Sequence, residues 1–119
     1  MLSNGLEMPS IGLGTYKLKS KEALVHAIMN AGYLHIDNAM RYKNEEVVGE
    51  ALAECFDLGK KREDLFITTK IFYKQYNDVE GAIRETLNKL KLDYVDLYLI
   101  HWPLGYYSEP QMPLHQVWP

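Results

Sequence analysis

Short apolar runs alternate with amphipathic stretches along most of this chain. The apolar runs cover residues 11–16, 33–37, 65–70 and 94–100, and the third is enriched in β-branched side chains, as strands usually are. Between these runs, apolar residues recur every three or four positions, which is the period of a helix with one buried face. The alternation predicts βα units that form a parallel sheet, and therefore an α/β fold.

Each predicted helix has an apolar face and residues suited to its ends. Asn44 is placed to cap the second helix, and Asn77 or Asp78 to cap the third. Gly32 and Gly59 favour an end to the first and second helices. A segment with proline at its start, residues 113–118, is typical of the first turns of another helix. The predicted faces are Leu24, Ala27, Ile28 and Ala31; Val47, Val48, Ala51, Leu52 and Cys55; and Val79, Ile83, Leu87 and Leu90.

Composition and charge narrow the possible environments and partners. The chain has 119 residues and a formal net charge of −3, without a basic stripe, a signal peptide or an apolar run long enough to span a membrane. We therefore expect a cytoplasmic protein that binds neither nucleic acid nor membrane, in which the run Lys60-Lys61-Arg62 is a solvated helix end. Cys55 is the only cysteine, and its position on a predicted apolar helix face indicates a core residue. The four histidines lack the spacing of metal ligands, so no metal site is expected.

Three of the predicted strands end in an ionisable residue, namely Asp37, Lys70 and His101. These residues are 33 and 31 positions apart, which suits one βα unit per interval. The carboxyl ends of parallel strands meet at one edge of the sheet, where α/β proteins form their active sites. Tyr42 follows Asp37 by five positions and should lie over the same edge. The sequence thus predicts a cluster of aspartate, tyrosine, lysine and histidine.

These four residue types suit the reduction of a carbonyl group. An ammonium such as Lys70 stabilises a nearby phenolate, which makes Tyr42 a better proton donor. Asp37 would keep Lys70 charged, and a neutral His101 could donate a hydrogen bond to a carbonyl oxygen as negative charge develops on it. Taken singly, each residue has an ordinary structural explanation as a cap, a surface lysine, a turn histidine or a packing tyrosine. Their joint position at the strand ends favours the catalytic interpretation.

Four motifs, in the same order and spacing, resemble the aldo-keto reductase family. Residues 35–45, HIDNAMRYKNE, are similar to the family signature around its catalytic aspartate and tyrosine. Residues 12–16, GLGTY, resemble the first-strand motif, and residues 66–70, FITTK, the lysine strand. Residues 92–103, LDYVDLYLIHWP, resemble the histidine strand. The chain is therefore identified as similar to the N-terminal portion of an aldose or aldehyde reductase-like member of this family.

The resemblance implies a (β/α)8 TIM barrel that reduces aldehydes or ketones to alcohols with NADPH. It makes Tyr42 the general acid, Lys70 the residue that tunes it, Asp37 the partner of Lys70, and His101 the residue that orients the substrate. Many family members have tryptophan where Tyr16 and Phe72 stand here. The implied cofactor-binding residues are Gly14, Thr15, Tyr16, Lys17 and Asp37, and the implied substrate-binding residues are Tyr16, Met40, Phe72, His101 and Trp102.

The length of the chain departs from the family pattern, because a TIM barrel needs about 250 residues. Residues 1–119 are expected to be the incomplete N-terminal part of one barrel domain, with four strands and three complete helices. The resemblance places most of the NADPH site downstream of residue 119. A half-barrel would expose two strand edges and an apolar face, which favours self-association. The alternative function is therefore a non-catalytic half-barrel that acts as an assembly or regulatory module.

Overall fold

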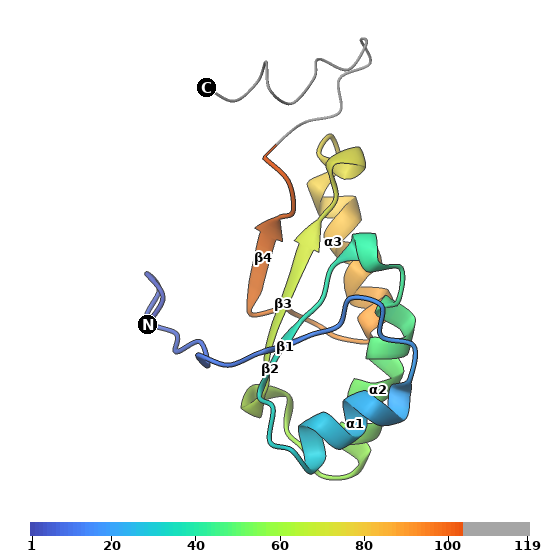
Figure 1. Cartoon of the computed structure of the whole chain (residues 1–119). Helices are drawn as coiled ribbons and strands as arrows, with labels where there is room; N and C mark the ends of the chain where they lie inside the picture. The colour runs from blue at the N-terminus through green and yellow to red at the C-terminus, as the bar shows by residue number, and fades with distance from the viewer. Residues whose placement is uncertain (104–119) are drawn as a thin grey trace.

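The computed structural model describes residues 1–103 and shows a single parallel sheet covered by helices on one face (Figure 1). The strand order is β1-β2-β3-β4, and all neighbours run parallel. The predicted βα repeat is therefore confirmed, whereas the helix predicted at residues 113–118 lies outside the described residues. The elements are β1 Leu13–Gly14, α1 Lys21–Met29, β2 His35–Asp37, α2 Glu45–Asp57, β3 Phe66–Ile71, α3 Val79–Leu90 and β4 Leu97–Ile100.

The core lies between the sheet and the helices. Its buried side chains come from the centre of β2 and β3 and from the inner faces of α1 and α2, and Cys55 is fully buried among them, as predicted. Burial of this apolar surface is the main force that holds the helices on the sheet. The core cluster comprises Leu24, Ile28, Ile36, Val48, Ala51, Leu52, Cys55, Leu65, Ile67 and Leu90.

The first helix matches its prediction except at its end. The Ser20 side chain accepts a hydrogen bond from the Ala23 amide at 3.1 Å and so caps the helix. Leu24, Ala27 and Ile28 are buried as expected. Ala31 is exposed, because α1 ends at Met29 and the chain turns at Gly32, whose φ is +79°. Its assignment to the helix face was therefore wrong.

The second helix starts where expected, but its capping residue has another role. Asn44 occupies the N-cap position, yet its side chain makes no capping hydrogen bond. Instead, the Asn44 amide donates to the carbonyl oxygens of Thr15, at 2.7 Å, and Leu18, at 3.1 Å. The loop carbonyls of the first βα connection need a donor in the interior, and Asn44 supplies it. The prediction of the helix start is confirmed, and that of the side-chain cap is wrong.

The third helix begins at the predicted cap but buries a different face. The Asp78 side chain accepts from the Gly81 amide at 2.9 Å, which confirms one of the two predicted caps. The buried residues are Ala82, Thr86 and Leu90, whereas Val79 is 50% exposed and Ile83 and Leu87 are only half-buried. The predicted face shares only Leu90 with the observed one.

Close packing between α2 and α3 explains this rotation of α3. A Cβ atom at Gly49 of α2 would clash with the Lys89 carbonyl oxygen of α3, so only glycine fits at this crossing. The hydroxyl of Thr86 donates to Glu45 Oε1 on α2 at 2.8 Å, in a fully buried position. The face of α3 is therefore set by small and polar contacts with α2, which a count of apolar positions does not detect.

β1, β2 and β4 are shorter than the apolar runs that predicted them, because residues at the ends of these runs lie in loops and not in the strands. Before β4, the Asp96 carboxylate accepts hydrogen bonds from the Ile67 amide and from Arg62 Nη2, both at 2.7 Å. Asp96 therefore has a structural role in the fold. Arg62 was expected to be solvated, but its side chain is only 16% exposed and also bonds the Leu65 and Tyr94 carbonyls. The ion pair thus fastens the start of β4 to β3.

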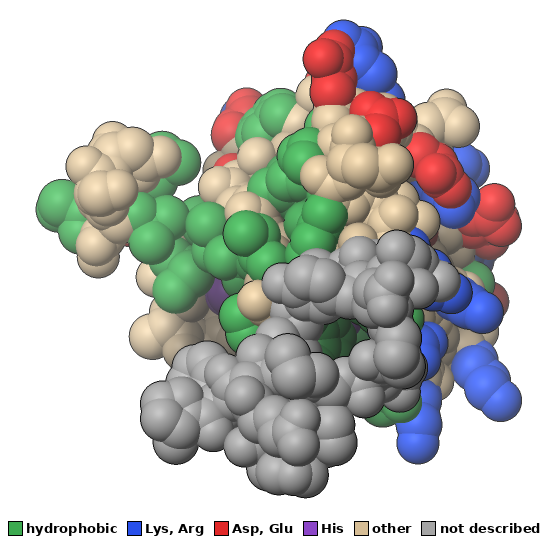
Figure 2. Space-filling model, turned by 90° about the horizontal axis from the view of Figure 1, so that it is seen from above, with side chains coloured by type: hydrophobic (Ala, Val, Ile, Leu, Met, Phe, Trp, Pro, Cys, Tyr) green, Lys and Arg blue, Asp and Glu red, His purple; other side chains and the backbone are tan. Residues whose placement is uncertain are grey.

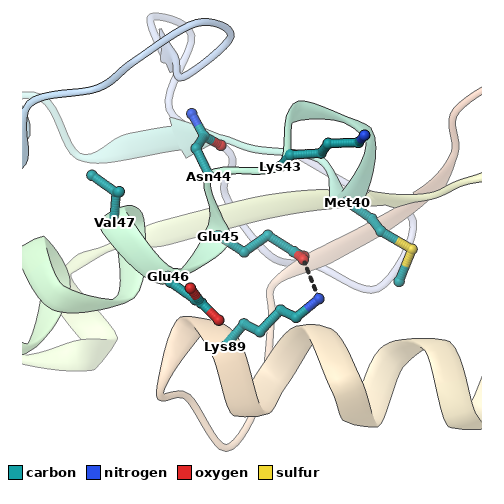
Figure 3. Close-up of a pocket in the computed structure, with 7 residues that line it drawn as sticks. All are labelled: Met40, Lys43, Asn44, Glu45, Glu46, Val47 and Lys89. Carbon is teal, nitrogen blue, oxygen red and sulfur yellow. Dashed lines mark ion pairs between the residues drawn. The ribbon is translucent and has the colours of Figure 1, made fainter.

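Glu45 is a buried acid on the seam between α2 and α3. Only 3% of it is exposed, and Figure 3 shows its carboxylate facing Lys89, whose Nζ is 3.9 Å from Glu45 Oε2. Burial raises the pKa of Glu45, while the hydrogen bond from Thr86 and the charge of Lys89 oppose this rise. The charged form therefore costs folding free energy in this position.

Replacing Glu45 with glutamine is expected to stabilise the fold at neutral pH. A raised pKa in the folded state means that the protonated carboxyl is favoured, so stability present at acidic pH is lost as pH rises through the folded pKa. Glutamine imitates the protonated form and still accepts from Thr86. Urea unfolding across this pH window should show a gain that grows with pH, and Glu46→Gln, at an exposed neighbour, should show none. A loss of stability for Glu45→Gln at every pH would contradict this interpretation.

Candidate active site

The structure brings the three strand-end residues to one edge of the sheet. Asp37 is the last residue of β2, Lys70 is the penultimate residue of β3, and His101 follows β4 directly. The register pairs Asp37 with Thr68 and Lys70 with Leu99, so Lys70 lies two positions beyond Asp37, and His101 lies two positions beyond Lys70. An offset of two keeps side chains on the same face of the sheet. Parallel pairing therefore creates the predicted cluster from residues that are far apart in sequence.

Lys70 is the centre of this cluster. Its Nζ donates to Asp37 Oδ1 at 2.6 Å, to the Asn38 carbonyl oxygen at 2.9 Å, and to the Tyr42 hydroxyl at 3.5 Å. An ammonium group has three protons, so all of them have acceptors. The Lys70 side chain is 14% exposed and that of Asp37 is 36% exposed, and the pair thus keeps a positive charge next to the phenol in a partly desolvated site.

Tyr42 is held between aromatic rings as well as beside Lys70. It ends the 3-10 turn η1, Met40–Tyr42, which connects β2 to α2. Its ring centroid lies 5.2 Å from that of Tyr16 and 5.7 Å from that of His101, which meets it edge-on. Such contacts restrict the ring and leave the direction of its hydroxyl well defined. Tyr42 and His101 are therefore direct neighbours at this edge of the sheet.

His101 is suited to donate a hydrogen bond as a neutral ring. Burial lowers the pKa of His101, and the positive charge of Lys70 lowers it further, while the charge of Asp37 acts in the opposite direction. Within residues 1–103, the buried Nδ1 atom of His101 has no hydrogen-bond partner. A neutral imidazole carries one N–H donor, so His101 can donate a hydrogen bond to a carbonyl oxygen without being charged itself.

We expect Lys70→Met to raise the titration midpoint of His101. The wild-type midpoint should lie below the ordinary histidine value of about 6.5. The substitution removes the repulsion from Lys70 and leaves Asp37 without its partner, and both changes favour the imidazolium. The midpoint is read from the ring proton resonances of His101 by NMR, in the wild type and in the variant. An unchanged midpoint for His101 would show that the two side chains are not coupled.

A buried hydrogen-bond network supports the cluster and was missed by sequence reasoning. Asn38 Nδ2 donates to Thr15 Oγ1 at 2.8 Å and to Asn44 Oδ1 at 3.1 Å, while Thr15 Oγ1 donates to the Asp37 carbonyl oxygen at 3.1 Å. Asn38 and Thr15 are fully buried. The network joins the loop after β1 to the loop after β2, which carries Tyr42. We call Thr15, Asn38 and Asn44 the asparagine brace.

The residues implied for cofactor binding lie on the loop after β1. Gly14 ends β1 with open space where a Cβ would stand, and Tyr16, on the following loop, is 65% exposed. Lys17 has its ammonium 5.4 Å from the Tyr16 ring centroid. Thr15, in contrast, is fully buried and its hydroxyl is used within the asparagine brace. Gly14, Tyr16 and Lys17 are therefore exposed and Asp37 is half-buried, while Thr15 supports the loop from below; their use in cofactor binding stays a prediction.

The residues implied for substrate binding fall into two groups. Tyr16 and Trp102 continue the row of rings around Tyr42, because Trp102 stacks on His101 with centroids 6.1 Å apart. Phe72 packs instead against Tyr73 and the Arg41 guanidinium. Met40 lines a hollow beside the start of α2 (Figure 3), whose other lining residues are Lys43, Asn44, Glu45, Glu46, Val47 and Lys89. The use of these residues in substrate binding stays a prediction.

Residues 1–103 contain neither a metal-binding cluster nor a membrane-spanning helix. No group of three or more histidine, cysteine, aspartate or glutamate side chains in this part of the chain is arranged to hold a metal ion. No helix in the same part is long and apolar enough to cross a bilayer.

Comparison with known proteins agrees with the geometry of this site. The model of the Aldo/keto reductase family matches residues 2–118. The chain is 46% identical to the aldose reductase of Encephalitozoon cuniculi over 113 residues, and 52% identical to the NADP-dependent D-sorbitol-6-phosphate dehydrogenase of Malus domestica over 107. These matches cover 92% and 87% of this chain but only 38% and 34% of the two relatives. The chain thus spans little more than a third of their length.

Solved structures show the same fold. A Bombyx mori aldo-keto reductase in complex with NADP matches with a TM-score of 0.81 and 39% identity, over 90% of this chain and 38% of its own. The aldose reductase of Schistosoma japonicum gives a TM-score of 0.80 and 41% identity, over 92% and 38%. The predicted TIM-barrel class is confirmed, with four strands and three helices of the barrel in residues 1–103. The chain belongs to the aldo/keto reductase family.

Proposed function

We propose that this chain supplies the proton-transfer and substrate-orienting residues of an NADPH-dependent reductase of aldehydes or ketones. The observation that carries the proposal is the contact of Lys70 Nζ with both Asp37 and Tyr42, beside a His101 ring that lies edge-on to the phenol. The Malus domestica relative is named as NADP-dependent, and the Bombyx mori aldo-keto reductase structure is a complex with NADP. In this proposal, residues 1–119 are the N-terminal part of one barrel domain in a cytoplasmic protein.

The roles of the side chains follow from their positions. A carbonyl oxygen between Tyr42 and His101 would accept a hydrogen bond from each ring. NADPH, when bound, supplies the hydride that reduces the carbonyl carbon. Tyr42 then gives its hydroxyl proton to the oxygen, and the ammonium of Lys70 stabilises the phenolate that remains. Asp37 balances the charge of Lys70 and holds its Nζ in place.

The accessible residues after β1 fit the nicotinamide half of the cofactor. Gly14 leaves open space at the sheet edge, and Tyr16 and Lys17 border it. The accessible carboxylate of Asp37 adds a hydrogen-bond acceptor there. We propose these four residues as the contribution of this chain to the cofactor site, with the Thr15 hydroxyl holding the loop in position.

The proposal is tested by NADPH oxidation with an aromatic aldehyde. Two proteins are assayed: the 119-residue chain, and a chimera in which the remainder of the Encephalitozoon cuniculi aldose reductase follows it. Circular dichroism and NADPH fluorescence establish folding and cofactor binding. Turnover by the chimera, with or without turnover by the chain, supports the assigned roles. A folded chimera that binds NADPH but reduces no aldehyde would overturn them.

A second candidate function is assembly of the chain through its exposed sheet edge. The outer strand β4 leaves Leu99 38% and Ile100 69% exposed, and unpaired strands with apolar side chains favour association. The class of partner would be another copy of the chain or a complementary half-barrel, in an assembly or regulatory role. Light scattering at several concentrations tests this candidate, and a dispersed monomer throughout the range would contradict it.

A further inference from the structure

The loops at the carboxyl edge of the sheet carry a concentrated positive charge, although the whole chain has a net charge of −3. These loops are residues 15–20, 38–44 and 72–78, which follow β1, β2 and β3. Their single acidic residue, Asp78, is engaged as the cap of α3. Figure 2 looks onto this edge and shows basic side chains gathered along one side of it. The basic residues of the three loops are Lys17, Lys19, Arg41, Lys43 and Lys74.

Arg41 differs from the other four because it presents a planar guanidinium that an aromatic ring holds in place; Lys17 also lies over a ring, that of Tyr16, but its ammonium is a point charge. Its guanidinium lies 5.4 Å from the ring centroid of Phe72, and the Phe72 ring packs in turn against Tyr73 with centroids 4.2 Å apart. Contact with a ring occupies the flat face of a guanidinium and leaves its N–H edge free. Arg41 is exposed, and in residues 1–103 it forms no ion pair or hydrogen bond. It is thus an oriented cation without a counter-charge.

The position of Arg41 places this cation next to the candidate active site. Arg41 precedes Tyr42 within the turn η1, and Phe72 comes two residues after Lys70. The pKa of His101 is lowered mainly by burial and by Lys70, and the charge of Arg41 contributes in the same direction. The guanidinium is therefore close enough for its charge to be felt at the ring that would bind the carbonyl oxygen.

We propose that Arg41 selects carbonyl substrates that carry an anionic group, a carboxylate or a phosphate, on the side of the molecule away from the carbonyl. The inference rests on the proposed function and specifies its substrate class. A guanidinium binds such groups through two parallel N–H bonds, which fixes the direction of the ligand as well as its affinity. With the anion on Arg41, the carbonyl end is directed towards Tyr42 and His101. The other basic residues of the edge add attraction without direction.

The kinetic test compares para-carboxybenzaldehyde with its methyl ester, in the chain and in the chimera described above. These aldehydes share their reactive group and differ in charge. Arg41→Gln should lower kcat/KM for the acid about tenfold and leave the ester within about twofold. Arg41→Lys should retain part of the preference. Lys43→Gln removes the same charge from the same loop, and because it removes only undirected attraction it should lower the ratio of acid to ester by less than about twofold. Equal effects of Arg41→Gln and Lys43→Gln would overturn a specific role for Arg41.

A binding test separates this inference from the proposed reaction. The two alcohol products, para-(hydroxymethyl)benzoate and its methyl ester, are titrated into the chain, and the His101 ring resonances are followed by NMR. The acid should bind more tightly than the ester in wild type, and Arg41→Gln should remove the difference. Equal binding in wild type would overturn the role of Arg41 even if both aldehydes are reduced. Selective binding without reduction of either aldehyde by the folded chimera would support Arg41 and overturn the proposed reaction.

Discussion

Tyr42→Phe is expected to reduce aldehyde reduction by at least about 100-fold, because a positioned general acid contributes a factor of this order or more. The phenylalanine ring keeps the aromatic contacts with Tyr16 and His101 but has no proton to give. Both kcat and kcat/KM should decrease by a similar factor, since the proton is needed in the transition state. The measurement is steady-state NADPH oxidation by the chimera of the chain with the aldose reductase remainder.

Tyr33→Phe is the matched control for this variant. Tyr33 precedes β2 at the opposite edge of the sheet, and its ring packs partly buried against the core. Loss of its hydroxyl should leave the rate close to that of wild type. If Tyr42→Phe kept most of the wild-type rate while Tyr33→Phe behaved as expected, Tyr42 could not be the proton donor.

Asn38→Asp should destabilise the fold by about 3 kcal/mol, although the two side chains have the same shape. The Asn38 amide is a double donor, to Thr15 Oγ1 and to Asn44 Oδ1. The Thr15 hydroxyl already donates its hydrogen bond to the Asp37 carbonyl oxygen, and the Asn44 amide group donates to two loop carbonyls. A carboxylate at position 38 would therefore face acceptor atoms in a fully buried site.

Urea unfolding at neutral pH measures this cost, with Asn77→Asp as the control at an exposed loop position. The control should change stability by less than about 0.5 kcal/mol. Part of the cost of Asn38→Asp should disappear in acid, where a protonated carboxyl can donate one of the two missing hydrogen bonds. Wild-type stability in the Asn38→Asp variant would show that the asparagine brace is not needed for folding.

The sequence was sufficient to predict the parts of the site that depend on periodicity. Asp37, Lys70 and His101 end successive strands at intervals of one βα unit, and parallel pairing then requires them to share an edge. Glycine at position 59 and aspartate at position 78 identified helix boundaries, because their effects are local to the backbone. These features need no knowledge of the tertiary packing.

The features that sequence reasoning missed depend on contacts between distant elements. Asn44 looks like an ordinary helix cap, and only the folded chain shows the carbonyls of Thr15 and Leu18 within its reach. The buried face of α3 follows its close approach to Gly49, which no apolar pattern encodes. Arg62 lies in a basic run typical of a solvated helix end, yet its partner Asp96 is 34 residues away.

The hydrogen bonds of Lys70 have a consequence for the path of protons during turnover. Each of its three protons already has an acceptor, on Asp37, Asn38 and Tyr42. Lys70 therefore has no proton directed to solvent, and it cannot pass one inward from bulk water without first breaking a contact. In the proposed reaction, Lys70 would act as a stationary charge, and Tyr42 would regain its proton from a source other than Lys70.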